Sequence, residues 1–172
     1  MKKVLVTVIA IAAFILSATA ADNVANKTVS VQGKARIITP ITLANTGSQA
    51  LDFGVIARGT TDATIVVGAN ASPSPSVATG DAVIISSAPQ TAAKFTVGGE
   101  TGKTYAITIP STTQTIISGA NTLNINVFTC SNGATGTIGT NDIFYVGGTL
   151  AVPAAAVAAS YTGTFNVTVN YN

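Results

Sequence analysis

The sequence predicts an all-β domain with the architecture of a β-sandwich, and three observations support this prediction. First, residues 160–172 (SYTGTFNVTVNYN) alternate strictly between an apolar and a polar parity, as a strand with one buried face does. Second, short runs rich in β-branched and aromatic residues recur at intervals of roughly 8–12 residues, separated by Gly, Pro and Asn. Third, the chain after residue 20 contains no sustained i, i+3, i+4, i+7 apolar spacing of the kind that indicates helices.

The first 20 residues have the pattern of a secretory signal peptide. Lys2 and Lys3 form a basic start, residues 4–16 are apolar, and Ala18-Thr19-Ala20 is a small-residue cleavage site. The apolar run is shorter than the roughly 20 residues that span a bilayer, so a membrane anchor is the less favoured alternative. We therefore expect an exported protein without a membrane span in its mature form, with an extension over residues 21–33 and a domain over residues 34–172.

Apolar alternation places strands along the whole domain. The expected strands are residues 34–43, 51–57, 63–67, 81–86, 92–97, 103–110, 121–129, 142–152 and 160–172. Stretches rich in Gly, Pro and small polar residues at 68–80, 98–102 and 131–141 predict loops, and residues 153–159 predict a small-residue connector. Pro40 lacks an N–H, which restricts its part of the first strand to an edge, a bulge or a switch between sheets. No strand follows residues 160–172, so we expect the outer edge of this last strand to need a partner.

Charged residues are scarce, at 8% of the chain against about 25% in ordinary domains. Two of the eight Lys and Arg residues lie in the predicted signal peptide, which leaves six basic residues against six acidic ones. A nearly neutral chain argues against binding to nucleic acid or to an anionic membrane, both of which require a clustered basic surface. A surface rich in Thr, Ala and Gly is poorly protected against association and suits a subunit whose surfaces are mostly occupied.

The residues of catalytic and metal sites are largely missing. The chain contains no histidine, which removes Ser-His-acid triads, Cys-His pairs and histidine zinc sites together. The six acidic residues are scattered, and the Gly-rich stretch 98–102 has no Lys-Ser/Thr after its glycines. We therefore predict no catalytic residue, no cofactor and no metal, and an enzyme is the least favoured function.

Cys130 is the single cysteine, so an internal disulfide framework is impossible. It is interpreted as a small buried apolar residue, with an intermolecular disulfide or a reactive thiol as the alternative.

Several motifs resemble a known family. They are A-R-I-I-T-P-I-T-L at residues 35–43, L-D-F-G at 51–54, A-K-F-T-V-G-G-E-T-G-K-T-Y-A-I-T-I-P at 93–110, Y-V-G-G-T-L-A-V at 145–152 and Y-T-G-T-F-N-V-T-V-N-Y at 161–171. These motifs resemble a family of small exported bacterial domains of unknown function. More distantly, the chain is similar to the spore-coat-protein-U-like subunits of archaic chaperone–usher pili, which also end in an alternating strand after a small-residue connector.

The pilin resemblance implies an immunoglobulin-like sandwich that lacks its last strand. A neighbouring copy's N-terminal extension then fills the gap, and a periplasmic chaperone fills it before an outer-membrane usher assembles the extracellular filament. The resemblance places the donor strand in residues 21–33, through Ala25, Val29, Val31 and Gly33, with Lys27 interrupting their parity. It places the edge of the acceptor groove at Tyr161, Phe165, Val167, Val169 and Tyr171. The disulfide common in such pilins is impossible here because there is one cysteine.

The second hypothesis is a self-contained secreted or surface-attached binding and adhesion module, for example for carbohydrate. In that case residues 28–33 fold back onto their own sheet and complete the sandwich. The chain has no Trp and only 6% aromatic residues, whereas sugar-binding faces usually expose aromatic rings.

Overall fold

The computed structural model describes residues 27–85, 89–139 and 142–172, and it separates into two units, Met1–Arg36 and Ile37–Asn172. The predicted signal peptide and Ala25 lie outside the described residues. Within the first unit, residues 27–36 form no strand or helix, and all of their side chains are exposed. The second unit is called the domain below, and its internal arrangement is independent of where the first unit lies.

The domain is all-β, as the sequence predicts. The only helix among the described residues is the short 3-10 turn η1 (Thr46–Ser48). The strands are β1 (Thr42–Asn45), β2 (Val55–Ala57), β3 (Ala63–Val67), β4 (Ser76–Thr79), β5 (Val83–Ile85), β6 (Ala93–Gly98), β7 (Thr104–Thr108), β8 (Gln114–Ser118), β9 (Asn121–Cys130), β10 (Thr135–Thr137), β11 (Asp142–Val152) and β12 (Thr168–Tyr171). No helix in the described part of the chain has the length and hydropathy that a membrane crossing requires.

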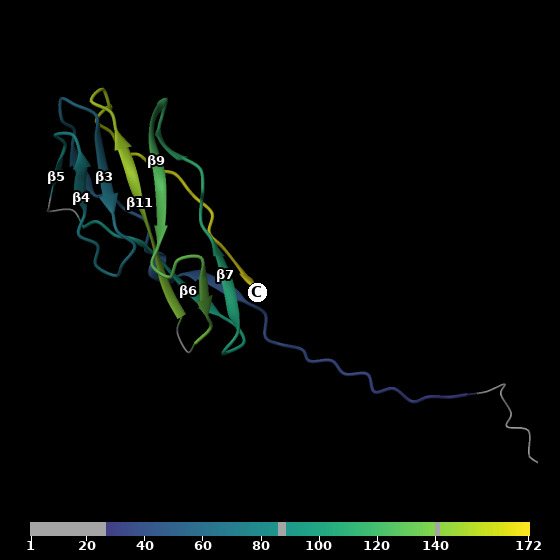
Figure 1. The fold of residues 1–172 in the computed structure, drawn as a ribbon. Helices are drawn as coiled ribbons and strands as arrows, with labels where there is room; N and C mark the ends of the chain where they lie inside the picture. Colours follow the sequence, from purple (N-terminus) through teal and green to yellow (C-terminus); the bar gives the residue numbers. More distant parts are fainter. Residues whose placement is uncertain (1–26, 86–88, 140–141) are drawn as a thin grey trace, which may run out of the picture. The chain divides into compact units, whose positions relative to one another are not determined.

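The largest sheet is built around β11 (Figure 1). Along one edge, the first half of β11 pairs with β6 and its second half pairs with β3. Along the other edge it pairs with β9. Val146 shows that the two edges differ, since it lies opposite Ala93 of β6 on one side and opposite Cys130 of β9 on the other. The exchange of partners occurs at Gly147, where an added Cβ would lie 2.3 Å from Val67 O. A residue with a side chain does not fit at this point, so the Gly147-Gly148 pair allows β3 to take over the edge that β6 leaves.

The strands that leave this sheet form the facing layer. The segment that follows β1 pairs with the segment that precedes β6. They pair first through the Asp52–Thr91 bridge and then as the two-stranded ribbon β2–β5. Ile56 and Ile84 of this ribbon point inward and pack against the core. A separate antiparallel sheet, β10-β7-β12, also contributes buried side chains to this core. The facing layer therefore consists of two separate pieces, the β2–β5 ribbon and the β10-β7-β12 sheet. The strand pairs within both pieces are antiparallel.

The core is apolar and contains no buried charged side chain among the described residues. Phe144 is fully buried and stacks on Phe95 with ring centroids 5.2 Å apart. Tyr105 is also fully buried, and its hydroxyl donates a hydrogen bond to Asp142 Oδ2. Burial, and then this hydrogen bond, raise the pKa of Tyr105 far above its ordinary value, so its hydroxyl stays a donor at physiological pH.

Several predicted strand boundaries were wrong. The strand expected over residues 34–43 starts only at Thr42, and the strand expected over 160–172 forms a ladder only in β12 and an isolated bridge at Thr162. Alternation reports which face is apolar, but a strand also needs a partner for its backbone groups. The short strands β4, β8 and β10 were missed, because β4 and β10 lie in loop-like composition and β8 follows a polar stretch.

The parity of the last segment is confirmed. On that face Val169 is buried, whereas Tyr161, Phe165, Val167 and Tyr171 are partly buried against the core. The alternating Thr and Asn residues are exposed.

Tyr171 ties the end of this segment to the start of the domain. Its hydroxyl donates a hydrogen bond to Thr39 O at 2.7 Å and accepts one from Glu100 N at 2.8 Å. An added Cβ at Gly99 would lie 2.4 Å from this hydroxyl, so the turn between β6 and β7 is shaped around it. The C-terminal strand is thus attached both to β7 by its ladder and to the segment before β1 by one side chain.

The Tyr105 ring leaves no room for a side chain at Gly136, and this gives a first prediction. Gly136 lies opposite Tyr105 in the β10–β7 ladder, and an added Cβ would lie 2.4 Å from the ring. Gly136→Ala should therefore lower the free energy of unfolding by about 1–3 kcal/mol through overpacking. The control is Gly139→Ala, since nothing lies within 4 Å of an added Cβ there and that glycine has no positive φ. Urea unfolding of both variants tests this, and equal midpoints would contradict it.

Candidate functional site

An apolar groove of about 770 Å³ lies between the β2–β5 ribbon and the segment that leads to β12. One wall is the chain over residues 50–58, which includes β2, and the other is the chain over residues 156–165, which leads to β12. The floor consists of side chains from β8, β9 and β11 in the large sheet: Gln114, Ile116, Leu123, Ile125, Leu150 and Val152. The groove is therefore a gap in one layer of the sandwich that reaches the face of the other layer.

The first wall presents an unpaired backbone edge. Among the described strands, β2 pairs only with β5, so its other edge has no ladder partner, and all three residues of β2 line the groove. Before β2 the wall is shaped by an Asx turn, in which Asp52 Oδ1 accepts a hydrogen bond from Gly54 N at 2.7 Å. Gly54 has φ +72°, a conformation that favours glycine, which explains the Asp-Phe-Gly sequence at this bend.

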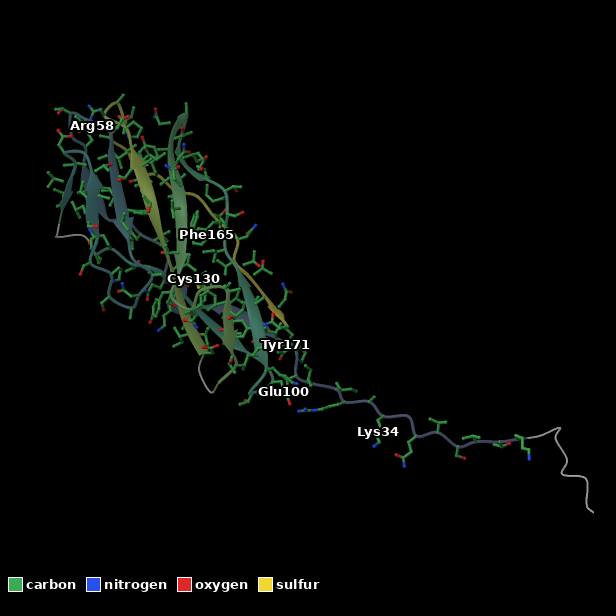
Figure 2. All side chains as sticks on the ribbon, in the orientation of Figure 1. Lys34, Arg58, Glu100, Cys130, Phe165 and Tyr171 are labelled. Carbon is green, nitrogen blue, oxygen red and sulfur yellow. The ribbon has the colours of Figure 1, made fainter. Side chains whose placement is uncertain are left out.

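Arg58 closes one end of the groove. Its Nη1 donates hydrogen bonds to Ala154 O at 3.2 Å and to Ala156 O at 2.7 Å, which joins the first wall to the start of the second. Asp62 Oδ1 accepts a hydrogen bond from Ala154 N at 2.8 Å and holds the same connector from the other side. Figure 2 shows Arg58 near one end of the domain, with Phe165 farther along toward Tyr171 and Glu100.

The second wall is held by contacts other than a strand ladder. Tyr161 Oη donates a hydrogen bond to Val157 O at 2.8 Å, and Thr162 forms a two-hydrogen-bond bridge with Ile117 of β8. Gly163 allows a close approach, since an added Cβ would lie 2.8 Å from Ile116 Cγ2. Phe165 contacts Phe128 with ring centroids 4.9 Å apart. The backbone over residues 163–167 forms no ladder, and residues 163–165 line the groove.

Asp81 fixes the turn that follows Arg58. Thr60 N and its hydroxyl donate to Asp81 Oδ2 at 2.9 and 2.7 Å, and Thr61 N and its hydroxyl donate to Oδ1 at 2.9 and 2.7 Å. These four bonds, led by the Thr60 hydroxyl, hold the pKa of Asp81 far below its usual range. Because the turn follows directly on Arg58, Asp81 helps to hold the closed end of the groove in place.

The structure places the predicted site residues in three different settings. Tyr161 and Phe165 line the groove. Val167, Val169 and Tyr171 continue the same face beyond it, into β12 and the Tyr171 tether. The donor residues Val29 and Val31 are 80% and 85% exposed, and Gly33 is exposed as well.

Sequence reasoning missed the wall over residues 50–58 and the role of Arg58. The Asp-x-Gly pattern at residues 52–54 is a recognisable turn signal that could have indicated a bend there. Arg58 binds Ala154 and Ala156, which lie 96 and 98 positions away in the sequence, and no local sequence pattern predicts these hydrogen bonds.

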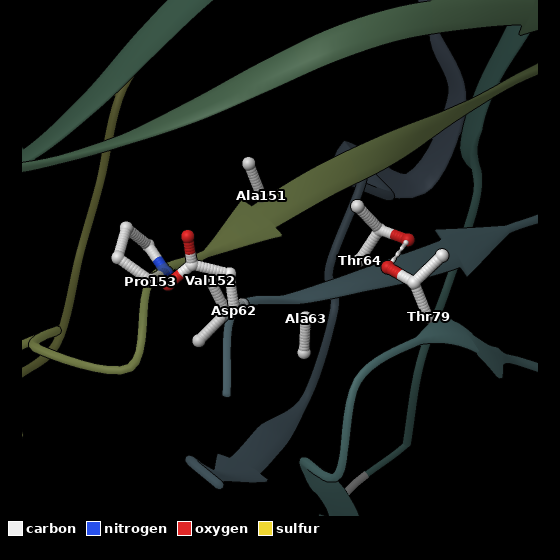
Figure 3. A pocket seen from close by; sticks show the side chains of 7 residues that line it. All are labelled: Asp62, Ala63, Thr64, Thr79, Ala151, Val152 and Pro153. Carbon is white, nitrogen blue, oxygen red and sulfur yellow. Dashed lines mark hydrogen bonds between the residues drawn. The ribbon is translucent and has the colours of Figure 1, made fainter. Parts of the chain in front are cut away.

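A second, smaller hollow of about 130 Å³ lies where β3, β4 and the end of β11 meet (Figure 3). Its polar groups are already engaged, because the Thr64 and Thr79 hydroxyls share a hydrogen bond at 2.8 Å and Asp62 binds the connector. Its other lining residues are small or apolar, so this hollow offers no reactive group.

The described residues contain no group of three or more His, Cys, Asp or Glu side chains arranged to hold a metal ion. Cys130 is half-buried at the end of β9 with a free thiol, and burial raises the pKa of this thiol above its ordinary value. Among described features, the groove has the geometry of a binding site for an extended apolar segment.

Comparison with known proteins agrees with the motif resemblance to a family of domains of unknown function. A model of a domain of unknown function (DUF4402) matches residues 41–171, which is nearly the whole domain. The chain belongs to the DUF4402 family. The matched residues include both walls and the floor of the groove. Neither the curated proteins nor the solved structures contain a match to this chain.

The Asp81 turn predicts a pH dependence. Because the folded-state pKa of Asp81 is depressed, its contribution to stability is present above the pKa of an unfolded Asp, about 4, and is lost as the pH falls below that value. Asp81→Asn should lower the melting temperature at pH 7, and its difference from the wild type should shrink between about pH 4 and pH 2. Thermal unfolding across this range measures the difference, and a gap that stays constant with pH would contradict the assignment. Thr60→Val removes the hydroxyl that lowers the pKa of Asp81 most, so the stability of this variant should also depend less on pH than that of the wild type.

Proposed function

We propose that this protein is a structural subunit of an extracellular filament and that neighbouring copies join by strand donation. On this proposal, the extension over residues 21–33 of one copy occupies the apolar groove of the next copy as an added strand. The observation that carries the proposal is the groove itself, a gap in one sandwich layer bordered by the unpaired edge of β2. The protein would reach the cell surface by export, as the signal-peptide pattern of residues 1–20 indicates.

The proposed donor is long enough for the groove and matches it in pattern. The wall over residues 50–58 contains nine residues, a length of about 30 Å for an extended chain, and the extension over residues 21–33 contains thirteen, which is enough to follow it. Val29 and Val31 lie on one face of the donor, and Thr28, Ser30 and Gln32 lie on the other. An inserted strand would therefore place its valines toward the apolar floor and its polar residues toward solvent.

Insertion would also cover apolar surface on the groove walls. Val55 on the first wall is 55% exposed, and Val157 on the second wall is 49% exposed. Burying Val29 and Val31 contributes about 3–6 kcal/mol before the cost of ordering the donor. Backbone hydrogen bonds to the free edge of β2 add roughly 0.5–1.5 kcal/mol each. These terms are comparable with the roughly 5–15 kcal/mol stability of a whole domain, so a filled groove would substantially stabilise the subunit.

Donation between identical copies has a defined outcome. Each copy carries one donor segment and one groove, so the contact is head-to-tail and produces an open fibre when the rotation between copies does not close. The distant similarity to spore-coat-protein-U-like pilins supports this function. It also suggests a periplasmic chaperone and an outer-membrane usher as partners during assembly.

The proposal predicts a parity-dependent effect in the donor. Val31→Asp should reduce polymer formation about tenfold or more, because it removes one buried aliphatic side chain and brings a charge to an apolar floor. Ser30→Asp, which adds the same charge on the other face of the same strand, should change polymer formation less than about twofold. Electron microscopy and sedimentation of material sheared from expressing cells measure the polymer.

A deletion separates this function from the alternative. Removing residues 21–33 should leave a secreted domain that no longer forms filaments. Filaments unchanged by the deletion would refute strand donation by this segment. A monodisperse monomer from the intact chain would instead favour a self-contained binding module.

A further inference from the structure

Lys27 shares a face with the two donor valines. The segment over residues 27–36 contains three cations and no acidic residue: Lys27, Lys34 and Arg36. In an extended strand, Lys27 points to the same side as Val29 and Val31, whereas Lys34 and Arg36 point to the opposite side. A donor that directs its valines to the groove floor therefore directs one cation, Lys27, into the groove.

The groove lining contains two charged residues, Asp52 and Arg58. The Arg58 guanidinium is committed to the carbonyl groups of Ala154 and Ala156 and would repel a second cation. Asp52 supplies the single carboxylate of the lining, and its hydrogen bond to Gly54 N uses Oδ1. A carboxylate with one oxygen engaged by a backbone N–H can still bind an ammonium group with its second oxygen.

Asp52 and Arg58 lie at opposite ends of the groove. Leu51, the neighbour of Asp52, lies against Gly148 of β11, since a Cβ added at Gly148 would be 3.1 Å from Leu51 Cδ2. Phe165 lies at the same end, because it contacts Phe128, the ladder partner of Gly148. Arg58 lies at the end where the connector begins.

We infer that Lys27 of one copy pairs with Asp52 of the next copy and that this pair sets the position of the donor strand in the groove. The inference rests on the proposed function, since it requires that the extension over residues 21–33 enters the groove. With Lys27 at Asp52, the two valines lie over the floor, and the donor runs in the same direction as residues 52–58. The reverse direction would place Lys27 beside Arg58 and leave Asp52 without a cation.

The overall distribution of charge is consistent with this pairing. Residues 37–172 contain three basic and five acidic residues, so the domain is acidic and the segment over residues 27–36 is basic. Opposite net charges favour encounter between the segment of one copy and the domain of another, an effect that salt weakens.

A charge exchange on the full chain tests the pair. Lys27→Glu should speed filament dissociation about two- to fivefold at low salt, and Asp52→Asn should do the same while keeping the acceptor for Gly54 N. The double variant Lys27→Glu/Asp52→Lys should restore the dissociation rate toward that of the wild type, since every contact in the filament then carries the reversed pair. Lys34→Glu is the matched control, because it changes the same charge in the same segment on the other face. All differences should vanish near 1 M salt.

Each outcome is decisive. Light scattering after dilution should show that filaments of Lys27→Glu and of Asp52→Asn dissociate faster than the wild type, whereas filaments of Lys34→Glu dissociate at the wild-type rate. Equal effects of Lys27→Glu and Lys34→Glu would refute the pair and leave strand donation intact. If Asp52→Lys fails to fold, combining Lys27→Gln with Asp52→Asn replaces the exchange, and strictly additive effects would refute the pair. An intact chain that forms no filament would instead refute the proposed function.

Discussion

The exchange of strand partners along one edge of β11 is the constraint on which the rest of the domain depends. Up to Val146 this edge pairs with β6, and from Gly148 onward it pairs with β3. One edge can serve only one partner at a time, so the chain segments that contain β6 and β1 must leave the sheet where the β11–β3 ladder starts. They leave as a pair and become the β2–β5 ribbon of the facing layer. The groove is the space between this ribbon and the segment that leads to β12.

Sequence reasoning was most accurate where one face of a strand is buried. In β3, residues Ala63, Ile65 and Val67 are buried and alternate with partly exposed residues, and the predicted range coincides with the observed one. The alternation of residues 160–172 likewise predicted which side chains point inward. It did not predict how much of the segment forms a ladder, because backbone pairing depends on what lies beside the segment. Residues 163–165 border the groove, and the stretch over residues 163–167 alternates without forming a ladder.

The sequence pointed to residues of only one of the two walls of the groove. Tyr161 and Phe165, which line its second wall, are residues that the pilin resemblance assigns to the edge of an acceptor groove, and that assignment stays a prediction. Its first wall was not predicted, because β2 is three residues long and its free edge results from the partner exchange at Gly147. The closing contact by Arg58 depends on the connector turning back toward residue 58, which no local propensity determines. Long-range contacts of this kind are where local patterns lose predictive value.

The Tyr171 tether has a mechanical consequence in the proposed filament. A pull on residues 27–36 would enter the domain through the segment that ends at Thr39, just before β1. Thr39 O is bound by the Tyr171 hydroxyl, and this hydroxyl also accepts from Glu100 N in the turn after β6. β1 belongs to the large sheet and β12 to the facing sheet, so this one side chain connects both layers at the point of entry. Force would then be shared between the β1–β6 and β12–β7 ladders instead of peeling β1 alone. The residue that ends the alternating strand would thus also anchor the point at which the donor segment joins the domain of each subunit.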